Sequence, residues 1–108
     1  MSNVISWADA KPVEAVPGLT RRTLGETDDM MLVEFRSEAK VETPMHTHPS
    51  QQIGYVASGE IEITIEGITT TCKAGDTYSV AGGVEHGAYF VVESVVIDCF
   101  SPPREDYR

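Results

Sequence analysis

The stretch QQIGYVASGEIEITIEGITTTCK, residues 51–73, decides the fold class. In its middle, Ile61, Ile63 and Ile65 alternate with polar residues, which is the period-two pattern of a half-buried strand. Gly59 and Gly67 interrupt the alternation on either side, as expected for turns between strands. The stretch therefore predicts consecutive strands over residues 52–58, 60–66 and 68–73.

Similar patterns on both sides of this stretch extend the prediction to most of the chain. Further strands are expected over residues 29–36, 77–80, 87–92 and 94–100. With the extended segment that contains His46 and His48, we expect eight or so strands in total. Helical periodicity is confined to the first dozen residues, where a turn could start near Ser6 or Asp9 and the prolines at 12 and 17 keep it short. After Ser101, two prolines prevent a central strand from continuing, so the tail should close over the barrel or run along its rim. We predict an all-β fold, a small antiparallel barrel or jelly roll.

Length and composition indicate a single domain over residues 1–108. The formal net charge of −9 argues against nucleic acid and anionic membranes as partners, because both attract clustered Lys and Arg. The chain has neither an apolar run long enough to span a bilayer nor a secretory leader, so we expect a cytoplasmic protein. Cys72 and Cys99 lie in strand-like stretches and are expected to be buried, inert thiols.

The histidines are the strongest chemical signal. His46 and His48 have the same parity, so on an extended strand both rings point to one face, and Gln52 shares that parity. Together with His86 from another strand, they could supply three imidazoles and an oxygen donor to a divalent cation. Gln51 competes with Gln52 for the oxygen position, although its parity points it away from the histidines.

These residues lie in motifs that resemble the two motifs of the cupin superfamily. The first motif appears as Lys40-x5-His46-x-His48-x3-Gln52-x6-Gly59, and the second as Gly75-x5-Ala81-x-Gly83-x2-His86-x3-Phe90. All spacings match, whereas Lys40, Gln52, Ala81 and Phe90 replace the Gly, Glu, Pro and Asn of the family. The resemblance implies the cupin double-stranded β-helix and one divalent metal ion, such as Zn, Ni, Mn or Fe, bound by His46, His48, Gln52 and His86.

The C-terminal run from Val96 to Tyr107 narrows the resemblance. It is similar to the tail of small single-domain cupins of the pectin degradation type, the KdgF family, and the similarity extends from about Gly18 to Tyr107. That family linearises 4,5-unsaturated monouronates, released from pectin or alginate, to the 5-keto-4-deoxyuronate. The resemblance implies that Asp98 and Arg104 are catalytic, and that Phe100 and Arg104 bind the sugar-acid substrate. Asp98 also fits from the residues alone, because a carboxylate inside an apolar strand is costly unless it faces a polar cavity.

Two other functions are compatible with the same fold. One is a different metal-dependent cupin enzyme of the dioxygenase type, which Gln52 disfavours because such sites usually contain a carboxylate ligand. The other is a non-catalytic cupin that binds a sugar acid or a metal. We also expect a homodimer, because small barrels with an exposed sheet of alternating apolar residues often pair across an edge.

Overall fold

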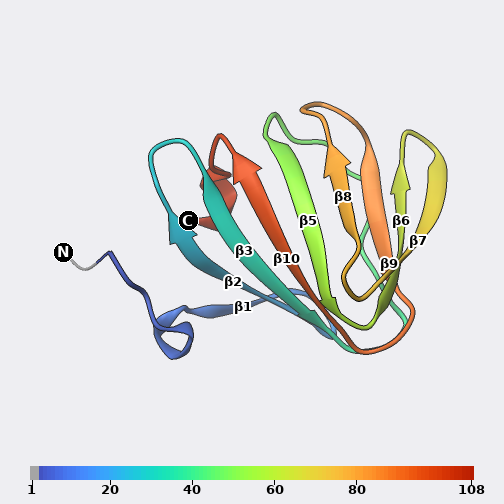
Figure 1. Cartoon of the computed structure of the whole chain (residues 1–108), viewed down its shortest axis with the longest axis horizontal. Helices are drawn as coiled ribbons and strands as arrows, with labels where there is room; N and C mark the ends of the chain where they lie inside the picture. Colours follow the sequence, from blue (N-terminus) through green and yellow to red (C-terminus); the bar gives the residue numbers. More distant parts are fainter. Residues whose placement is uncertain (1–2) are drawn as a thin grey trace.

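The computed structural model describes residues 3–108, which form ten antiparallel strands in two sheets (Figure 1). The six-stranded sheet has the order β1-β2-β3-β10-β5-β8, and the four-stranded sheet has the order β4-β9-β6-β7. The strands of the larger sheet are β1 (Pro12–Val16), β2 (Leu19–Glu26), β3 (Met31–Ser37), β10 (Ser94–Ser101), β5 (Gln51–Ser58) and β8 (Thr77–Val80). Those of the smaller sheet are β4 (Val41–Glu42), β9 (His86–Phe90), β6 (Glu60–Ile65) and β7 (Ile68–Lys73).

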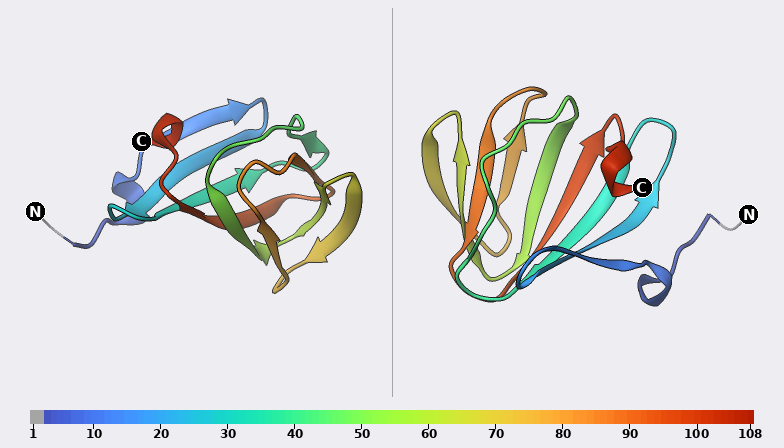
Figure 2. Two further views of the ribbon diagram at one scale, coloured as in Figure 1. Left: turned by 90° about the horizontal axis from the view of Figure 1, so that it is seen from above. Right: turned by 180° about the vertical axis from the view of Figure 1, so that it is seen from behind.

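The two sheets face each other and enclose an apolar core (Figure 2). In β10, every second residue is buried, from Ser94 and Val96 to Asp98 and Phe100. The same alternation continues in β5, where Val56 is fully buried. Because neighbouring strands are in register, their inward residues form continuous rows across the sheet. Along the strands, successive rows lead from the apolar core around Val56 and Val96 to rows that include the buried polar residues Gln52 and Asp98.

The all-β cupin prediction is confirmed, and the expected strands lie within a residue or two of the observed ones. The N-terminal region differs from the prediction, because residues 12–26 form the hairpin of β1 and β2 around Pro17-Gly18. The burial pattern of β2 explains the omission: after its buried first residue, nearly every position is half-buried, so period-two alternation is absent.

Within residues 3–11 and 102–108, each end of the chain contains a single 3-10 turn. The first, η1 (Trp7–Asp9), is preceded by Ser6, which agrees with the helical turn expected there. The second, η2 (Glu105–Tyr107), follows the prolines that end β10 and lies beside the open end of the barrel (Figure 1). No helix within residues 3–108 is long and apolar enough to cross a membrane.

The cysteines differ from each other in burial. Cys72 packs in the core, as predicted, and burial raises the pKa of its thiol. Cys99 is only half-buried, because its parity in β10 is opposite to that of Asp98 and places it on the outer face of the sheet. The expectation of a buried thiol was therefore wrong for Cys99, since strand membership alone does not determine which face a residue occupies.

Lys40 occupies the position at which the first cupin motif has a glycine. Its φ of 64° lies in the left-handed region, which glycine adopts without a steric penalty. The backbone of the motif is thus retained at this position although the residue is not. Lys40 donates its backbone N–H to the Phe90 carbonyl at 2.7 Å, which joins the turn to the end of β9.

Candidate functional site

Three histidines converge from two segments that are far apart in the sequence. His46 and His48 lie in the extended segment between β4 and β5, whereas His86 is the first residue of β9. Two backbone hydrogen bonds of 2.9 and 3.0 Å join His46 to His86. As a result, one potential ligand atom from each of the three rings lies within 4.8 Å of the others. The structure therefore brings together all three histidines that the sequence predicted as metal ligands.

Each histidine ring is oriented by a hydrogen bond to the backbone. The Nδ1–H groups of His46, His48 and His86 donate to the carbonyls of residues 44, 50 and 84, at 3.0, 2.8 and 2.8 Å. A carbonyl oxygen can only accept, so the proton of each neutral ring is on Nδ1 and the lone pair is on Nε2. This second hydrogen bond is typical of metal-binding histidines, because it fixes both the tautomer and the ring orientation.

Gln52 joins the histidines, whereas Gln51 does not. The side chain of Gln52 is 7% exposed, and its Oε1 lies 3.1 Å from Nε2 of His48. Gln51 is exposed to solvent, as its opposite parity in β5 predicts. Of the two glutamines that the sequence left as alternatives, Gln52 is the one placed where it could contribute an oxygen ligand.

The donor set fits a divalent cation. Nε2 of His48 lies 3.2 Å from Nε2 of His86 and 3.1 Å from Oε1 of Gln52, so lone pairs face one another at short distance. Such an arrangement is unfavourable unless a positive charge lies between the donors. Burial lowers the pKa of both His48 and His86, and the positive charge of Arg104 lowers them further. Both rings are therefore neutral near pH 7, as a metal ligand must be.

Asp98 lies on β10 beside the histidine cluster and is 4% exposed. Its Oδ1 accepts a 2.6 Å hydrogen bond from the hydroxyl of Tyr78. Burial raises its pKa from 3.8 to about 6, although Tyr78, Gln52 and Arg104 favour the charged form. A carboxyl group with this pKa can both accept and release a proton near neutral pH.

The amide of Gln52 connects Asp98 to the histidines. Its proximity to the Asp98 carboxyl favours the charged form of that group, and only the amide NH₂ can donate to a carboxylate. The amide oxygen is thereby turned toward His48, consistent with their 3.1 Å separation. A glutamate at position 52 would instead place a second carboxylate against Asp98. The replacement of the usual cupin Glu by Gln thus matches the presence of a buried carboxyl next to the cluster.

Arg104 follows β10, and its side chain is largely buried. It forms an ion pair with Asp106 that the sequence did not predict. Its Nη2 contacts Oδ2 of Asp106 at 2.8 Å, and its Nε contacts Oδ1 at 3.3 Å. Its guanidinium also stacks on the ring of Tyr107, with 3.9 Å between Cζ and the ring centroid. Arg104 therefore already holds a carboxylate in a two-point contact, which is the geometry expected for binding a substrate carboxylate.

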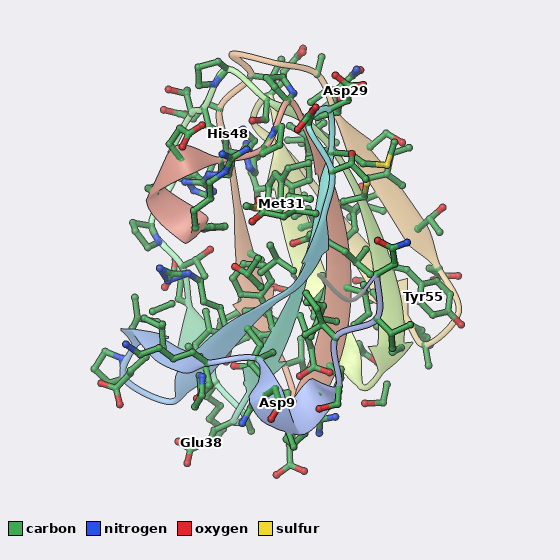
Figure 3. All side chains as sticks on the ribbon, turned by 90° about the vertical axis from the view of Figure 1, so that its left-hand side faces the viewer. Asp9, Asp29, Met31, Glu38, His48 and Tyr55 are labelled. Atoms are coloured by element: carbon green, nitrogen blue, oxygen red, sulfur yellow. The ribbon has the colours of Figure 1, made fainter. Side chains whose placement is uncertain are left out.

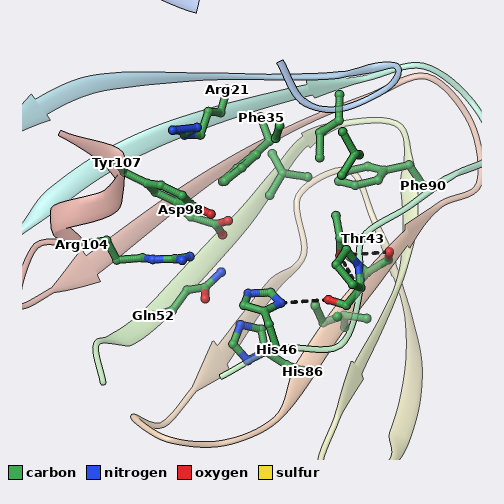
Figure 4. A pocket seen from close by; sticks show the side chains of 18 of the residues that line it. Arg21, Phe35, Thr43, His46, Gln52, His86, Phe90, Asp98, Arg104 and Tyr107 are labelled. Carbon is green, nitrogen blue, oxygen red and sulfur yellow. Dashed lines mark hydrogen bonds between the residues drawn. The ribbon is translucent and has the colours of Figure 1, made fainter. Parts of the chain in front are cut away.

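One cavity of about 530 Å³ connects these groups. It is lined by His46, Gln52, His86, Asp98 and Arg104 among others. Figure 4 shows the side chains of Gln52, Asp98 and Arg104 directed toward the space beside His46 and His86. The volume is in the range of small-molecule sites in proteins.

Aromatic rings form the apolar wall of this cavity. Phe100 lies edge-on to His48, with 5.4 Å between the ring centroids, and edge-on to Tyr107 at 5.6 Å. The position of His48 on the inner side of the sheet, next to the C-terminal turn, is visible in Figure 3. Phe100 therefore contacts a histidine of the cluster as well as the tail that covers the cavity.

Sequence reasoning missed Tyr78, Asp106 and Tyr107 as parts of the site. For Tyr78, the signal was Gly54 in a neighbouring strand, because a glycine inside a strand often marks a close approach of another group. For Asp106, the signal was an acidic residue two positions after Arg104, which in an irregular tail allows no geometric prediction. Tyr107 carried no signal of its own, since its role depends on where η2 packs.

Comparisons with known proteins agree with this geometry. The family model described as "Cupin domain" matches residues 32–96. The pectin degradation protein KdgF of Dickeya dadantii (strain 3937) is 37% identical over 92 residues, covering 83% of this chain and 84% of that protein. The structure of KdgF from Halomonas sp. has a TM-score of 0.92 and 29% identity, and each chain is covered completely. An RmlC-like cupin from Shewanella frigidimarina has a TM-score of 0.93 and 30% identity, covering 100% of this chain and 97% of that one.

Proposed function

The chain belongs to the cupin family, and within it to the group of the pectin degradation protein KdgF, and on this basis we propose that it is a metal-dependent enzyme that opens 4,5-unsaturated monouronates. The product is the open-chain 5-keto-4-deoxyuronate. The observation that carries the proposal is the convergence on one cavity of two of the three clustered histidines, a carboxyl group with a pKa of about 6, and an arginine.

His46, His48, His86 and Gln52 would hold the divalent cation. When bound, the cation supplies positive charge that lowers the energy of a developing oxyanion. The fixed Nδ1 contacts of the three rings support this assignment, because they keep the Nε2 lone pairs convergent before any metal enters.

Arg104 would bind the substrate carboxylate through its guanidinium fork. Its two-point contact with Asp106 supports this role, since a carboxylate already lies against the guanidinium fork. Phe100 would then limit where the sugar ring can lie, because its ring contacts both His48 and Arg104.

Asp98 would move the proton that the reaction requires. Ring opening breaks the bond between C1 and the ring oxygen, and the anomeric hydroxyl loses a proton as C1 becomes an aldehyde. The ring oxygen is left as an enolate oxygen on C5, and addition of a proton at C4 gives the neutral ketone. One proton is thus taken from the hydroxyl and one is delivered to C4, with no oxidation or reduction, and a carboxyl group with a pKa near 6 suits both steps.

The test uses unsaturated monouronates released freshly from polygalacturonate or alginate by a lyase. Their conjugated double bond absorbs in the ultraviolet, and the absorbance should decay faster with the metal-loaded protein than in buffer. Oxygen should not be consumed, because the reaction is redox neutral. A decay rate equal to the spontaneous rate with both substrates, at saturating metal, would overturn the proposed function.

Asp98→Asn separates catalysis from binding. The substitution is nearly isosteric but removes the group that accepts the proton, so kcat should fall by about 10²-fold or more while KM changes little. Steady-state kinetics on the same substrate provide the measurement, and elemental analysis verifies that the variant retains its metal. A variant with wild-type kcat and bound metal would remove Asp98 from the mechanism.

A further inference from the structure

We propose that Tyr78 is a positioning residue for the reaction, because its hydroxyl fixes the orientation of the Asp98 carboxyl. The inference rests on the proposed function, and it adds a residue that the sequence motifs do not include. Tyr78 lies on β8 at the edge of the larger sheet, two strands away from Asp98 on β10. It reaches Asp98 across the intervening strand, β5.

The contact depends on a row of three residues across neighbouring strands. Gly54 on β5 is the register partner of both Asp98 on β10 and Tyr78 on β8. The side chains of Tyr78 and Asp98 therefore project to the same, inner side of the sheet, with the glycine between them. The Tyr78 hydroxyl donates to Oδ1 of Asp98 at 2.6 Å.

Gly54 makes this contact possible because it has no side chain. A Cβ atom at position 54 would overlap both the ring and hydroxyl of Tyr78 and Oδ1 of Asp98. Glycine inside a strand weakens the sheet, so its presence between these two groups requires a local reason. The space that it leaves is filled by the tyrosine ring, which brings the hydroxyl to the carboxyl.

The hydrogen bond constrains how the carboxyl group is presented to the cavity. Tyr78 holds Oδ1, so Oδ2 is the oxygen that the phenol does not engage, and the Gln52 amide also acts on this carboxyl group. A carboxyl group that rotates about its side-chain bonds presents this oxygen only part of the time, whereas a fixed one presents it continuously. Pre-orientation of this kind contributes to rate rather than to substrate binding.

The variant Tyr78→Phe tests the inference because it keeps the ring that fills the space above Gly54. We expect kcat to fall about 10-fold or more, KM to stay within about 2-fold, and metal content to remain unchanged. Tyr55→Phe is the matched control. Tyr55 follows Gly54 on β5 and also has register partners on β10 and β8, but it is 47% exposed on the outer face of the sheet. The control should have wild-type kinetics.

A kinetic cycle with Asp98→Asn distinguishes positioning from general support of the fold. If Tyr78 acts through Asp98, Tyr78→Phe should cost little more once Asp98 has been replaced, whereas a purely structural effect would persist in the double variant. Wild-type kcat in Tyr78→Phe, or full additivity in the double variant, would overturn the inference.

A second cycle keeps the inference testable without any substrate. The free energies of unfolding of wild type, both single variants and the double variant, measured in urea with a chelator, give the coupling between Tyr78 and Asp98. Non-additive values support the pairing, and additive values overturn it. If the wild type is inactive but the unfolding free energies still show coupling between Tyr78 and Asp98, the proposed function is overturned and the pairing is not. Failure of the proposed function and failure of the inference therefore appear in different measurements.

Discussion

The interior of the barrel has two halves that are built from the same strands, and one of them combines buried polar groups with apolar ones. In β5, Val56 faces the apolar half and Gln52 faces the polar half. In β10, Val96 and Asp98 differ in the same way, although they are only two residues apart. A single strand therefore contributes to the core at one point and to the candidate site at the next inward position.

This difference separates the sources of stability and chemistry. The apolar half contains the large buried cluster around Ile61, Phe90 and Val96, in which burial of apolar surface stabilises the fold. The polar half contains buried groups, including His86 and Asp98, that cost free energy unless they are paired. The core thus holds the strands rigidly enough for unfavourable groups to remain together at the other end.

The largest expected effect is the loss of metal when the polar half loses two of its three imidazoles. His46→Ala combined with His48→Ala should reduce bound metal from one ion per chain to almost none, measured by elemental analysis. Circular dichroism should still show a β-protein, because the apolar half is untouched. Retained stoichiometric metal would show that these histidines are not the metal ligands. An unfolded variant would show that the fold depends on the polar half as well as on the apolar half.

A large effect confined to the other half is expected for Ile61→Ala. Ile61 is fully buried in the apolar cluster, so the substitution should reduce the free energy of unfolding by about 2–5 kcal/mol. Urea unfolding measures this loss, and metal content at low temperature should be unchanged. Ile68→Ala is a suitable control, since Ile68 is 70% exposed and should change stability by less than about 0.5 kcal/mol.

A pH-dependent effect of intermediate size is expected from Asp98 in the chelated protein. The raised pKa means that the folded state holds the proton more tightly than the unfolded state between about pH 4 and pH 6. The free energy of unfolding should therefore fall as pH rises through this window, by about 3 kcal/mol for a change from 3.8 to about 6. Asp98→Asn should lack this component, and a variant that follows the wild-type profile would contradict the assignment.

The smallest effect is expected at the rim, for Arg104→Ala. Loss of a two-point, charge-assisted contact should raise KM about 10- to 100-fold, with a smaller decrease in kcat. Arg104→Lys should restore only part of the affinity, because an ammonium group lacks the planar fork. Equal decreases in kcat for both variants, with unchanged KM, would indicate that Arg104 acts on the reaction and not on binding.

The sequence was sufficient for the fold and for the histidine cluster because both depend on regular spacing. Alternation in residues 60–66 and glycines between strands predict the sheets, and the equal parity of His46, His48 and Gln52 predicts their convergence. The structure brings them together although His46 and His48 precede β5 and lie outside the named strands. The hairpin of β1 and β2 was missed because its residues line the cavity with polar side chains such as Arg21 and lack alternation.

The remaining parts of the site depend on packing that spacing does not encode. Tyr78 and Asp98 meet only because β5 separates their strands and carries Gly54 at the matching register position. Such a row requires the strand order of the sheet, which is a tertiary property. Tyr107 and Asp106 belong to an irregular tail, whose path is determined by contacts with β2, including a hydrogen bond from the Thr23 hydroxyl to the Tyr107 carbonyl.

The ion pair between Arg104 and Asp106 makes the entry of a carboxylate an exchange of anions instead of a simple addition. The guanidinium would release one partner as it takes the next, so the charge around it would stay constant through the binding event. The Asp106 side chain is 62% exposed, and water can solvate it as soon as it leaves. Since Asp106 is part of η2, its departure would loosen the end of the chain. Occupancy of the cavity should therefore be detectable at a distance, as faster amide hydrogen exchange in residues 105–108.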